Sequence, residues 1–159
     1  MSAEMPETPA TEPTAFAALT ARLQRLEDLD AIRQLFIDYG RHLDRCDFAA
    51  YAALFADDGE VLLGPLGRAQ GPDAIRALME RTLAGREGET YHVISSPVIE
   101  LSGDTATSSV MWTVVARNSE GGTAVTMIGH HDDQLVRQRG QWRFARRRGF
   151  VDIPSTYRA

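Results

Sequence analysis

The residues best suited to acid–base chemistry are the histidines and the acids near them. Two of the four histidines open the run His130-His131-Asp132-Asp133, the most unusual local feature of the chain. Histidine changes charge near neutral pH, and a carboxylate beside it fixes its tautomer, so such a pair can take a proton from a substrate. Side chains alternate between the two faces of a strand. We therefore expect His131 and Asp133 on one face, and His130 and Asp132 on the other.

A further acid lies at the end of a predicted helix. Asp44 follows the apolar Leu43, although an acid near a helix C-terminus opposes the helix dipole. Asp47 is predicted to cap the next helix, which leaves the Asp44 carboxylate free for another role. We expect His42, on the same helix, to be an exposed side chain.

The elements that must position these residues begin with helices. Apolar residues at three- and four-residue steps predict a long amphipathic helix from Phe16 to Leu43, broken near 27–30. Cap, turn and proline signals indicate the next elements. These are a helix at 48–56 ended by Asp57-Asp58-Gly59, a short strand at 60–64 and a third helix at 71–85.

The second half of the chain reads as four long strands. They are predicted at 90–101, 105–117, 123–138 and 141–153, separated by turn signals rich in Gly, Asp, Asn and Ser. Helices followed by an antiparallel meander predict an α+β fold, in which a twisted sheet curls over the helices and encloses a pocket. Residues 1–14 are predicted to be a disordered tail, and residues 15–159 a single domain.

Composition excludes several classes of partner. The chain of 159 residues has a net charge of −5 and no dense stripe of Lys and Arg that could bind nucleic acid. The one basic run, at 143–150, lies in a predicted strand, so its charges are divided between the two faces. No stretch is long and apolar enough for a membrane span, and no signal region opens the chain. A single cysteine, Cys46, excludes an internal disulfide. We expect a soluble cytoplasmic protein.

The order and spacing of certain stretches resemble a known family. These stretches are LDRCDFAAYAALFADDGEV, GPDAIRALM, TYH, LSGDTATS and GHHDDQLVRQRGQWRFARR. Over roughly residues 24–153 the chain resembles the SnoaL-like, scytalone dehydratase-like branch of the nuclear transport factor two superfamily. The resemblance implies a cone-shaped α+β barrel, with three N-terminal helices packed on a curved, mostly antiparallel sheet around an apolar pocket. It also implies a homo-oligomer, a trimer or a dimer.

The resemblance implies a catalytic pair. In dehydratase-like members an Asp at the end of the first long helix pairs with a His on the first long strand, and the matching residues are Asp44 and His92. A carboxylate that accepts the imidazole N–H would stabilise the imidazolium formed when the other nitrogen takes a proton. The structural alternatives are a local cap for Asp44 and a core histidine for His92.

Other positions match helper groups of the family. Tyr39 matches a polar or phenolic helper, with a place on the helix's core stripe as the alternative. Arg147 matches a cavity-facing arginine of dehydrochlorinase-like members that helps a leaving group depart, but Arg146 and Arg148 leave its face open. His131 matches a cavity-wall aromatic or amide, so it is a candidate second polar wall or proton donor.

The other side chains that line the expected pocket are predicted to be apolar, which suits a hydrophobic or polycyclic ligand. The chain departs from its relatives at Val114-Val115-Ala116, where dehydratases carry a further His or Asp. It departs again at Asp152, where bile-acid dehydratase carries an Arg. Both departures argue against identical substrates. The expected substrate-binding residues are Phe55, Val61, Leu63, Trp112, Val114 and Met127.

These observations predict a cofactor-independent lyase or isomerase of the dehydratase type. It would act on a hydrophobic cyclic, polyketide-like or steroid-like molecule by Asp–His proton abstraction. No metal is expected, because no spaced motif such as HExxH is present. Two alternatives stay open: a ligand-binding or accessory protein without chemistry, and a polyketide-type aldol cyclase.

Overall fold

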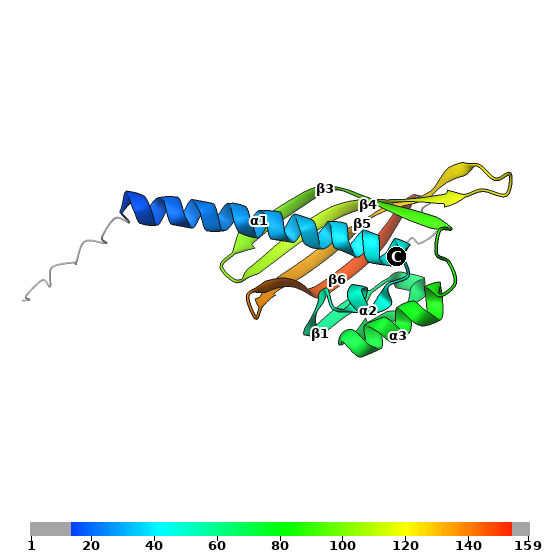
Figure 1. Ribbon diagram of the computed structural model, residues 1–159, viewed down its shortest axis with the longest axis horizontal. Coiled ribbons are helices and arrows are strands. Elements are labelled where there is room, and N and C mark those ends of the chain that lie inside the picture. Colours follow the sequence, from blue (N-terminus) through cyan, green and yellow to red (C-terminus); the bar gives the residue numbers. More distant parts are fainter. Residues whose placement is uncertain (1–13, 154–159) are drawn as a thin grey trace, which may run out of the picture.

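The structure is a computed structural model that describes residues 14–153, and it consists of helices on one face of a curved, unclosed sheet (Figure 1). The six strands lie in the order β2-β1-β6-β5-β4-β3. Neighbouring strands are antiparallel except β1 and β6, which are parallel. The elements are α1 (Ala15–Asp44), α2 (Phe48–Ala52), β1 (Phe55–Leu62), a 3-10 turn (Gly64–Leu66), β2 (Arg68–Gln70), α3 (Pro72–Leu83), β3 (Thr90–Ser102), β4 (Thr105–Arg117), β5 (Thr123–Gln138) and β6 (Gln141–Ile153).

The predicted α+β architecture is confirmed, and the four long strands lie where the alternating pattern placed them. In β4, for example, every second residue from Ala106 to Val114 is buried. These inward side chains pack against α1, α2 and α3 and form the core, whose largest members include Phe36, Tyr51 and Phe144. The predicted disordered tail falls almost wholly outside the described residues.

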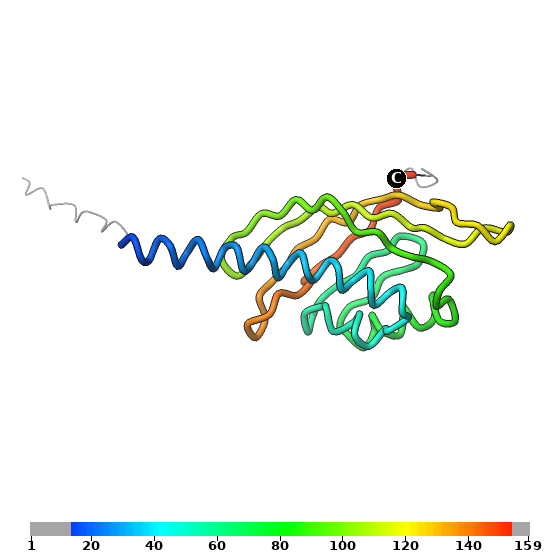
Figure 2. Tube along the Cα trace, turned by 45° about the horizontal axis from the view of Figure 1, so that its top comes forward, coloured from blue at the N-terminus to red at the C-terminus, as the bar shows by residue number. Residues whose placement is uncertain are grey.

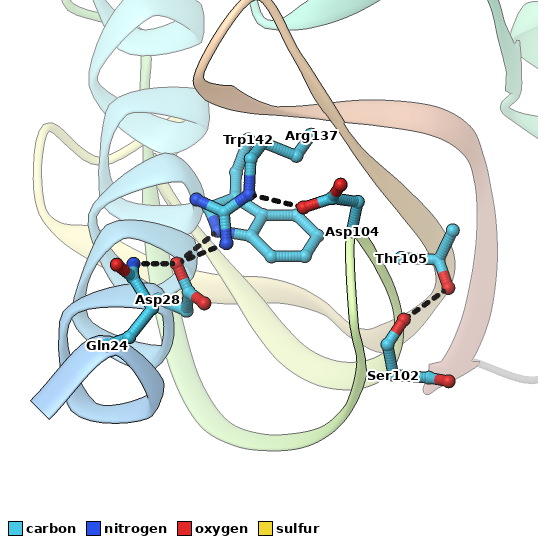
Figure 3. Close-up of polar contacts among 7 residues, drawn as sticks. All are labelled: Gln24, Asp28, Ser102, Asp104, Thr105, Arg137 and Trp142. Carbon is cyan, nitrogen blue, oxygen red and sulfur yellow. Dashed lines mark hydrogen bonds and ion pairs between the residues drawn. The ribbon is translucent and has the colours of Figure 1, made fainter. Parts of the chain in front are cut away.

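The long helix is continuous, so the predicted break near 27–30 is wrong. Asp28, within the predicted break, is buried and lies opposite the β5–β6 hairpin (Figure 3). Arg137 Nη2 donates to its carboxylate at 2.6 Å and Trp142 Nε1 at 3.2 Å. Burial raises the pKa of Asp28, but the hydrogen bonds from Arg137 and Trp142 outweigh it and leave the pKa below its ordinary value. Partners from distant strands thus satisfy the hydrogen-bonding needs of an acid on the buried side of the continuous helix.

The second helix ends sooner than predicted, and the strand after it begins sooner. Asp47 caps α2 as expected, accepting from Ala50 N at 3.1 Å, but the helix stops at Ala52. Asp57-Asp58-Gly59, read as a turn, lies inside β1. The parallel pairing of β1 with β6 contains an irregularity between Phe55 and Glu60 that accommodates these residues. Pairing with a distant strand outweighs the local turn signal.

The first long helix lies along β3, the edge strand of the sheet, and its N-terminal end projects beyond the strands (Figure 2). The buried residues of α1 begin only at Asp28 and end at Leu43. The helix therefore has a supported C-terminal half and an unsupported N-terminal half. None of the helices in the described range combines the length and the apolar character that a membrane crossing needs.

Candidate functional site

The centre of the candidate site is the pair Asp44 and His92, which the structure brings together. His92 Nδ1 lies 2.7 Å from Asp44 Oδ1, and the backbone N–H of His92 donates to the same carboxylate at 3.0 and 3.2 Å. A carboxylate accepts only, so Nδ1 carries the proton and Nε2 keeps its lone pair. Within residues 14–153, Nε2 makes no hydrogen bond. The pair is therefore arranged as a base oriented by an acid.

Local structure explains how α1 delivers this acid. Gly40 lies one turn before Asp44, and a Cβ there would come within 3.1 Å of Ile94 Cγ1 and 3.4 Å of the His92 carbonyl oxygen. The glycine thus allows close approach of the helix to β3. Because β3 is an edge strand, the outward N–H of His92 is available to the carboxylate rather than to another strand.

Access to the pair is restricted. The side chains of His92 and Asp44 are 19% and 11% exposed. Two hollows elsewhere do not reach them: one of about 490 Å³ on the outer face of the sheet, and one of about 570 Å³ between α1 and the β5–β6 hairpin. Met127, paired with Val114 beside His92, is 39% exposed and marks the more open end of the concave face.

His131 lies deeper on the same concave face, and Asp133 shares its side of β5, as strand alternation predicted for these two residues. Its ring packs on Tyr39 and Trp112, with centroids 5.2 and 5.8 Å away, and lies across Gly149, where a Cβ would be 3.4 Å from it. Its Nε2 is 3.5 Å from the Tyr39 hydroxyl. Burial, and then the charge of Arg147, lower the pKa of His131 well below its ordinary value. The imidazole is therefore neutral at physiological pH.

Arg147, and neither of its neighbours, points inward. Its guanidinium makes two bonds of 2.7 Å to Asp133, to which Ser108 also donates at 2.9 Å. Its side chain has no exposed surface, and it lies 4.1 Å from the ring centroid of Tyr39 and 3.9 Å from that of Phe144. The expectation of an inward arginine is met, but aromatic rings cover this one and a carboxylate neutralises it.

Several buried polar atoms around Tyr39 and His131 have no hydrogen-bond partner among the described residues. Burial also raises the pKa of Tyr39 and, more strongly, that of Tyr51, so both phenols are protonated. Groups of this kind can donate to a substrate oxygen or to water when the interior opens. The atoms are Tyr51 Oη, Trp112 Nε1, His131 Nδ1 and Arg147 Nη1.

The apolar residues predicted to bind substrate are not equivalent. Trp112 and Val114 are buried on the concave face beside His92 and His131, and Met127 is half-exposed at its open end. Phe55 and Val61 are buried in β1, where Phe55 packs on Tyr51 and Phe144 as part of the core. Leu63 is partly buried and approaches Gly149.

A second histidine–acid pair lies on the outer face of the sheet. His130 Nδ1 is 2.8 Å from Asp152 Oδ2, with side chains 32% and 45% exposed, and the imidazole stacks on Phe150 at 4.7 Å. Asp152, which stands where bile-acid dehydratase was expected to carry an Arg, thus serves as the partner of His130. His42 is less exposed than predicted, at 26%, and lies 4.0 Å from Asp47.

Sequence reasoning missed the roles of Asp133, Ser108 and Asp152. Alternation had already placed Asp133 on the same face as His131, and this was the signal available. Its partner could not be read, because the pairing depends on the register of β5 against β6. Within residues 14–153 no group of three or more His, Cys, Asp or Glu side chains is close enough to hold a metal ion.

Solved structures of other proteins share this arrangement of elements. An NTF2-like protein with a cystatin-like fold from Novosphingobium aromaticivorans is 28% identical, with a TM-score of 0.78, and the match covers 92% of this chain and 95% of that one. A presumed scytalone dehydratase from the same organism is 29% identical, with a TM-score of 0.68 and coverages of 85% and 91%. The hexachlorocyclohexane dehydrochlorinase LinA-type3 from Novosphingobium barchaimii is 20% identical, with a TM-score of 0.72 and coverages of 83% and 91%; it shows likeness of fold.

The family follows from the sequence match together with this geometry. No curated protein matches the chain. The model of the SnoaL-like domain matches residues 24–148, which is most of the chain and includes Asp44, His92, His131 and Arg147. The chain belongs to the SnoaL-like domain family.

Proposed function

We propose that the protein is a cofactor-independent lyase or isomerase that removes an acidic proton from a hydrophobic cyclic substrate. The observation that carries this proposal is the bond of 2.7 Å between Asp44 and His92 Nδ1, which leaves Nε2 as an oriented base. A structural histidine at the end of a strand does not need a carboxylate that binds both its ring and its backbone. The likeness to a presumed scytalone dehydratase supports the same class of reaction.

The reaction begins at Nε2 of His92. This atom takes a proton from a carbon next to a carbonyl, and the C–H electrons form an enolate. Asp44 stabilises the imidazolium that results. In a dehydration the enolate then expels hydroxide from the next carbon, the imidazolium returns its proton to that hydroxide, and water leaves. In an isomerisation the proton returns to a different carbon.

The enolate oxygen needs donors, and the concave face offers them deeper than His92. The Tyr39 phenol and the neutral His131 imidazole, with its single N–H, lie there, and Trp112 Nε1 is a further N–H donor. Neutral donors stabilise a developing negative charge without attracting anions to the resting enzyme. Arg147 does not contact the enolate oxygen directly, because the rings of Tyr39 and Phe144 cover its guanidinium and Asp133 compensates its charge. Any effect of Arg147 on the enolate acts through space.

The lining favours an apolar, cyclic substrate. The groups nearest the pair on the concave face are Val114, Trp112 and Ile94, and Met127 lies at the open end. Apolar walls with a few convergent polar groups are typical of sites for small hydrophobic molecules. Ring closure of a polyketide by aldol chemistry would use the same base and the same donors, and it is the second reaction we would test.

The test measures proton abstraction without knowledge of the natural substrate. A cyclic ketone such as 2-tetralone is incubated with the protein in D₂O, and exchange of the hydrogens next to the carbonyl is followed by NMR. His92→Ala and Asp44→Asn should lower the rate above background by about 10²-fold or more, as expected for loss of general base catalysis.

The outer pair provides a matched control. His130→Ala also removes a histidine bonded to an aspartate, but from the opposite face of the sheet, and it should leave the exchange rate unchanged. Equal rates for wild type and His92→Ala would contradict the proposal. If 2-tetralone binds to the concave face without any exchange above background, the protein is a ligand-binding member of the family.

A further inference from the structure

The N-terminal part of α1, before the buried Asp28, carries large apolar side chains that are mostly exposed. The N-terminal end of this part projects beyond the sheet (Figure 1). Phe16 is 79% exposed, and Leu19, Leu23 and Leu26 are 55–63% exposed. Four large apolar side chains in a row on one helix are unusual for a surface that faces only water. We call these four residues the α1 stripe.

The spacing of the α1 stripe is that of a two-stranded coiled coil. Steps of three, four and three residues place Phe16 and Leu23 at heptad positions a, and Leu19 and Leu26 at positions d. Two such helices bury these side chains by packing knobs into holes. A helix of this length without tertiary support is only marginally stable alone, so a partner would also stabilise it.

The α1 stripe faces away from the domain. Successive residues of an α-helix are about 100° apart, at 3.6 residues per turn. On this basis the α1 stripe lies on the side of α1 opposite to Ile32, Leu35 and Phe36, which pack on the sheet. A partner helix against the stripe therefore meets no part of the domain, and two domains can lie on opposite sides of a pair of helices.

We propose that the occupant of the α1 stripe is the same stripe of a second copy of this chain, running parallel to it. Arg22 and Glu27 flank the stripe at heptad positions g and e, and neither forms an ion pair within residues 14–153. In a parallel pair, position g of one helix meets the following position e of the other. Each Arg22 then meets the Glu27 of the partner copy, which gives two ion pairs by symmetry.

Charge also disfavours the antiparallel arrangement. In an antiparallel pair Phe16 would face Leu26 of the other copy, and Leu19 would face Leu23. Position g of one helix would then lie beside position g of the other, which brings the two copies of Arg22 together. Like charges at these positions oppose pairing. The same reasoning sets where the contact ends, because Asp30 and Arg33 occupy the next positions a and d. In a parallel pair each would face its own copy, so the helices separate beyond Glu27.

Another segment of the chain is a poor candidate for this stripe. The first 13 residues contain only Met1 and Met5 as large apolar side chains, against four in the stripe. The paired stripes span only two heptads, so the interface belongs to the class below about 1,200 Å² that is typical of weak complexes. We therefore expect a dimer that dissociates on dilution.

The first experiment measures mass against concentration. Sedimentation velocity of the full chain from micromolar to millimolar concentrations should show a monomer that becomes a dimer. Leu19→Glu with Leu23→Glu should abolish the dimer, while helix content by circular dichroism persists because Leu and Glu have similar helix propensities. Ala21→Glu, which adds a single negative charge on the other side of the helix, should leave the dimer intact. A dimer that survives the paired leucine substitutions would overturn the proposal, as would a monomer at every concentration.

A charge exchange tests the orientation. Arg22→Glu alone and Glu27→Arg alone should each raise the dissociation constant several-fold, and the double variant Arg22→Glu/Glu27→Arg should restore it. Restoration is expected only if these two residues meet across the pair. If the double variant is as weak as the sum of the single changes, the parallel pairing is wrong.

Cross-linking tests the register directly. The only native cysteine is removed by Cys46→Ser, and a single cysteine is placed by Leu23→Cys. In the parallel pair the two new thiols face each other, so mild oxidation should give a disulfide-linked dimer. Ala21→Cys in the same background should remain monomeric. Efficient cross-linking only in a mixture of Leu19→Cys and Leu23→Cys chains would indicate an antiparallel pair and refute the proposal.

Discussion

Arg147 and Asp133 form a two-bond ion pair that is wholly enclosed by the fold. Nε and Nη2 of the arginine donate to Oδ1 and Oδ2 of the aspartate at 2.7 Å each, and neither side chain has exposed surface. The two residues are direct partners across β5 and β6. Burial alone lowers the pKa of Arg147, but the Asp133 carboxylate more than compensates and the pKa is raised. The guanidinium therefore stays charged beneath Tyr39.

Breaking this pair from one side should destabilise the protein strongly. Arg147→Met leaves Asp133 as a buried carboxylate with Ser108 as its remaining donor. We expect a loss of about 3–5 kcal/mol in the free energy of unfolding, measured by urea denaturation, because an uncompensated buried charge remains.

The double variant Asp133→Leu/Arg147→Met provides the control for that prediction. Replacing both charges by apolar groups of similar size removes the desolvation cost together with the attraction, so most of the lost stability should return. A double variant that is less stable than either single variant would contradict this. It would show that the attraction between the two charges stabilises the fold by more than their burial costs.

Two glycines of the concave face should respond differently to a methyl group. A Cβ at Gly129 would lie 2.0 Å from the Phe150 carbonyl oxygen and 2.3 Å from Trp112 Cζ2, whereas at Gly149 the nearest atom is 3.4 Å away. Gly129→Ala should cost about 1–3 kcal/mol or more and shift the Trp fluorescence, because the indole must move. Gly149→Ala should cost less than Gly129→Ala. Equal losses in thermal melts would contradict this account of the packing.

The neutral His131 should make stability depend on pH. Its pKa in the folded protein is well below the ordinary value of 6.5. Between the two values the unfolded chain binds a proton that the folded chain does not, so stability rises with pH there. The contribution is present above pH of about 6.5 and is lost as pH falls below it, by up to about 1.4 kcal/mol per pH unit. Urea midpoints between pH 7.5 and 5 should show this slope, and His131→Gln should flatten it.

The two acids that bind Arg137 should differ in importance. Asp28 is buried and also accepts from Trp142, whereas the side chain of Asp104 is 79% exposed (Figure 3). Asp28→Asn should lower the free energy of unfolding by about 1–3 kcal/mol, because it weakens a buried set of hydrogen bonds. Asp104→Asn should change it by less than about 1 kcal/mol, as for other exposed pairs. If both substitutions lowered the free energy of unfolding equally, burial of the acid would not matter and the prediction would be wrong.

Much of this protein could be predicted from local patterns. Period-two alternation predicted the four long strands and placed His131 and Asp133 on one common face, and helical spacing predicted α1 and α3. The resemblance of ordered stretches indicated that Asp44 and His92 would meet. These features depend on periodicity and element order, which are visible along the chain.

Other features depend on contacts between distant segments. The start of β1 is decided by its parallel pairing with β6, and the continuity of α1 at Asp28 is supported by Arg137 and Trp142. Neither partner lies within 50 residues of the residue that needs it, so no local signal reports them.

The three consecutive arginines of β6 show most clearly what local pattern can predict and what depends on pairing with another strand. Trp142 and Phe144 point inward, and strict alternation from them would bring Arg146 and Arg148 inward as well. The register against β5 is instead interrupted between Gln134 and Leu135, where Ala145 is the extra residue of β6. A bulge of this kind reverses the facing of every residue after it. The chain alone supplied three candidate arginines, and the pairing of two strands selected Arg147.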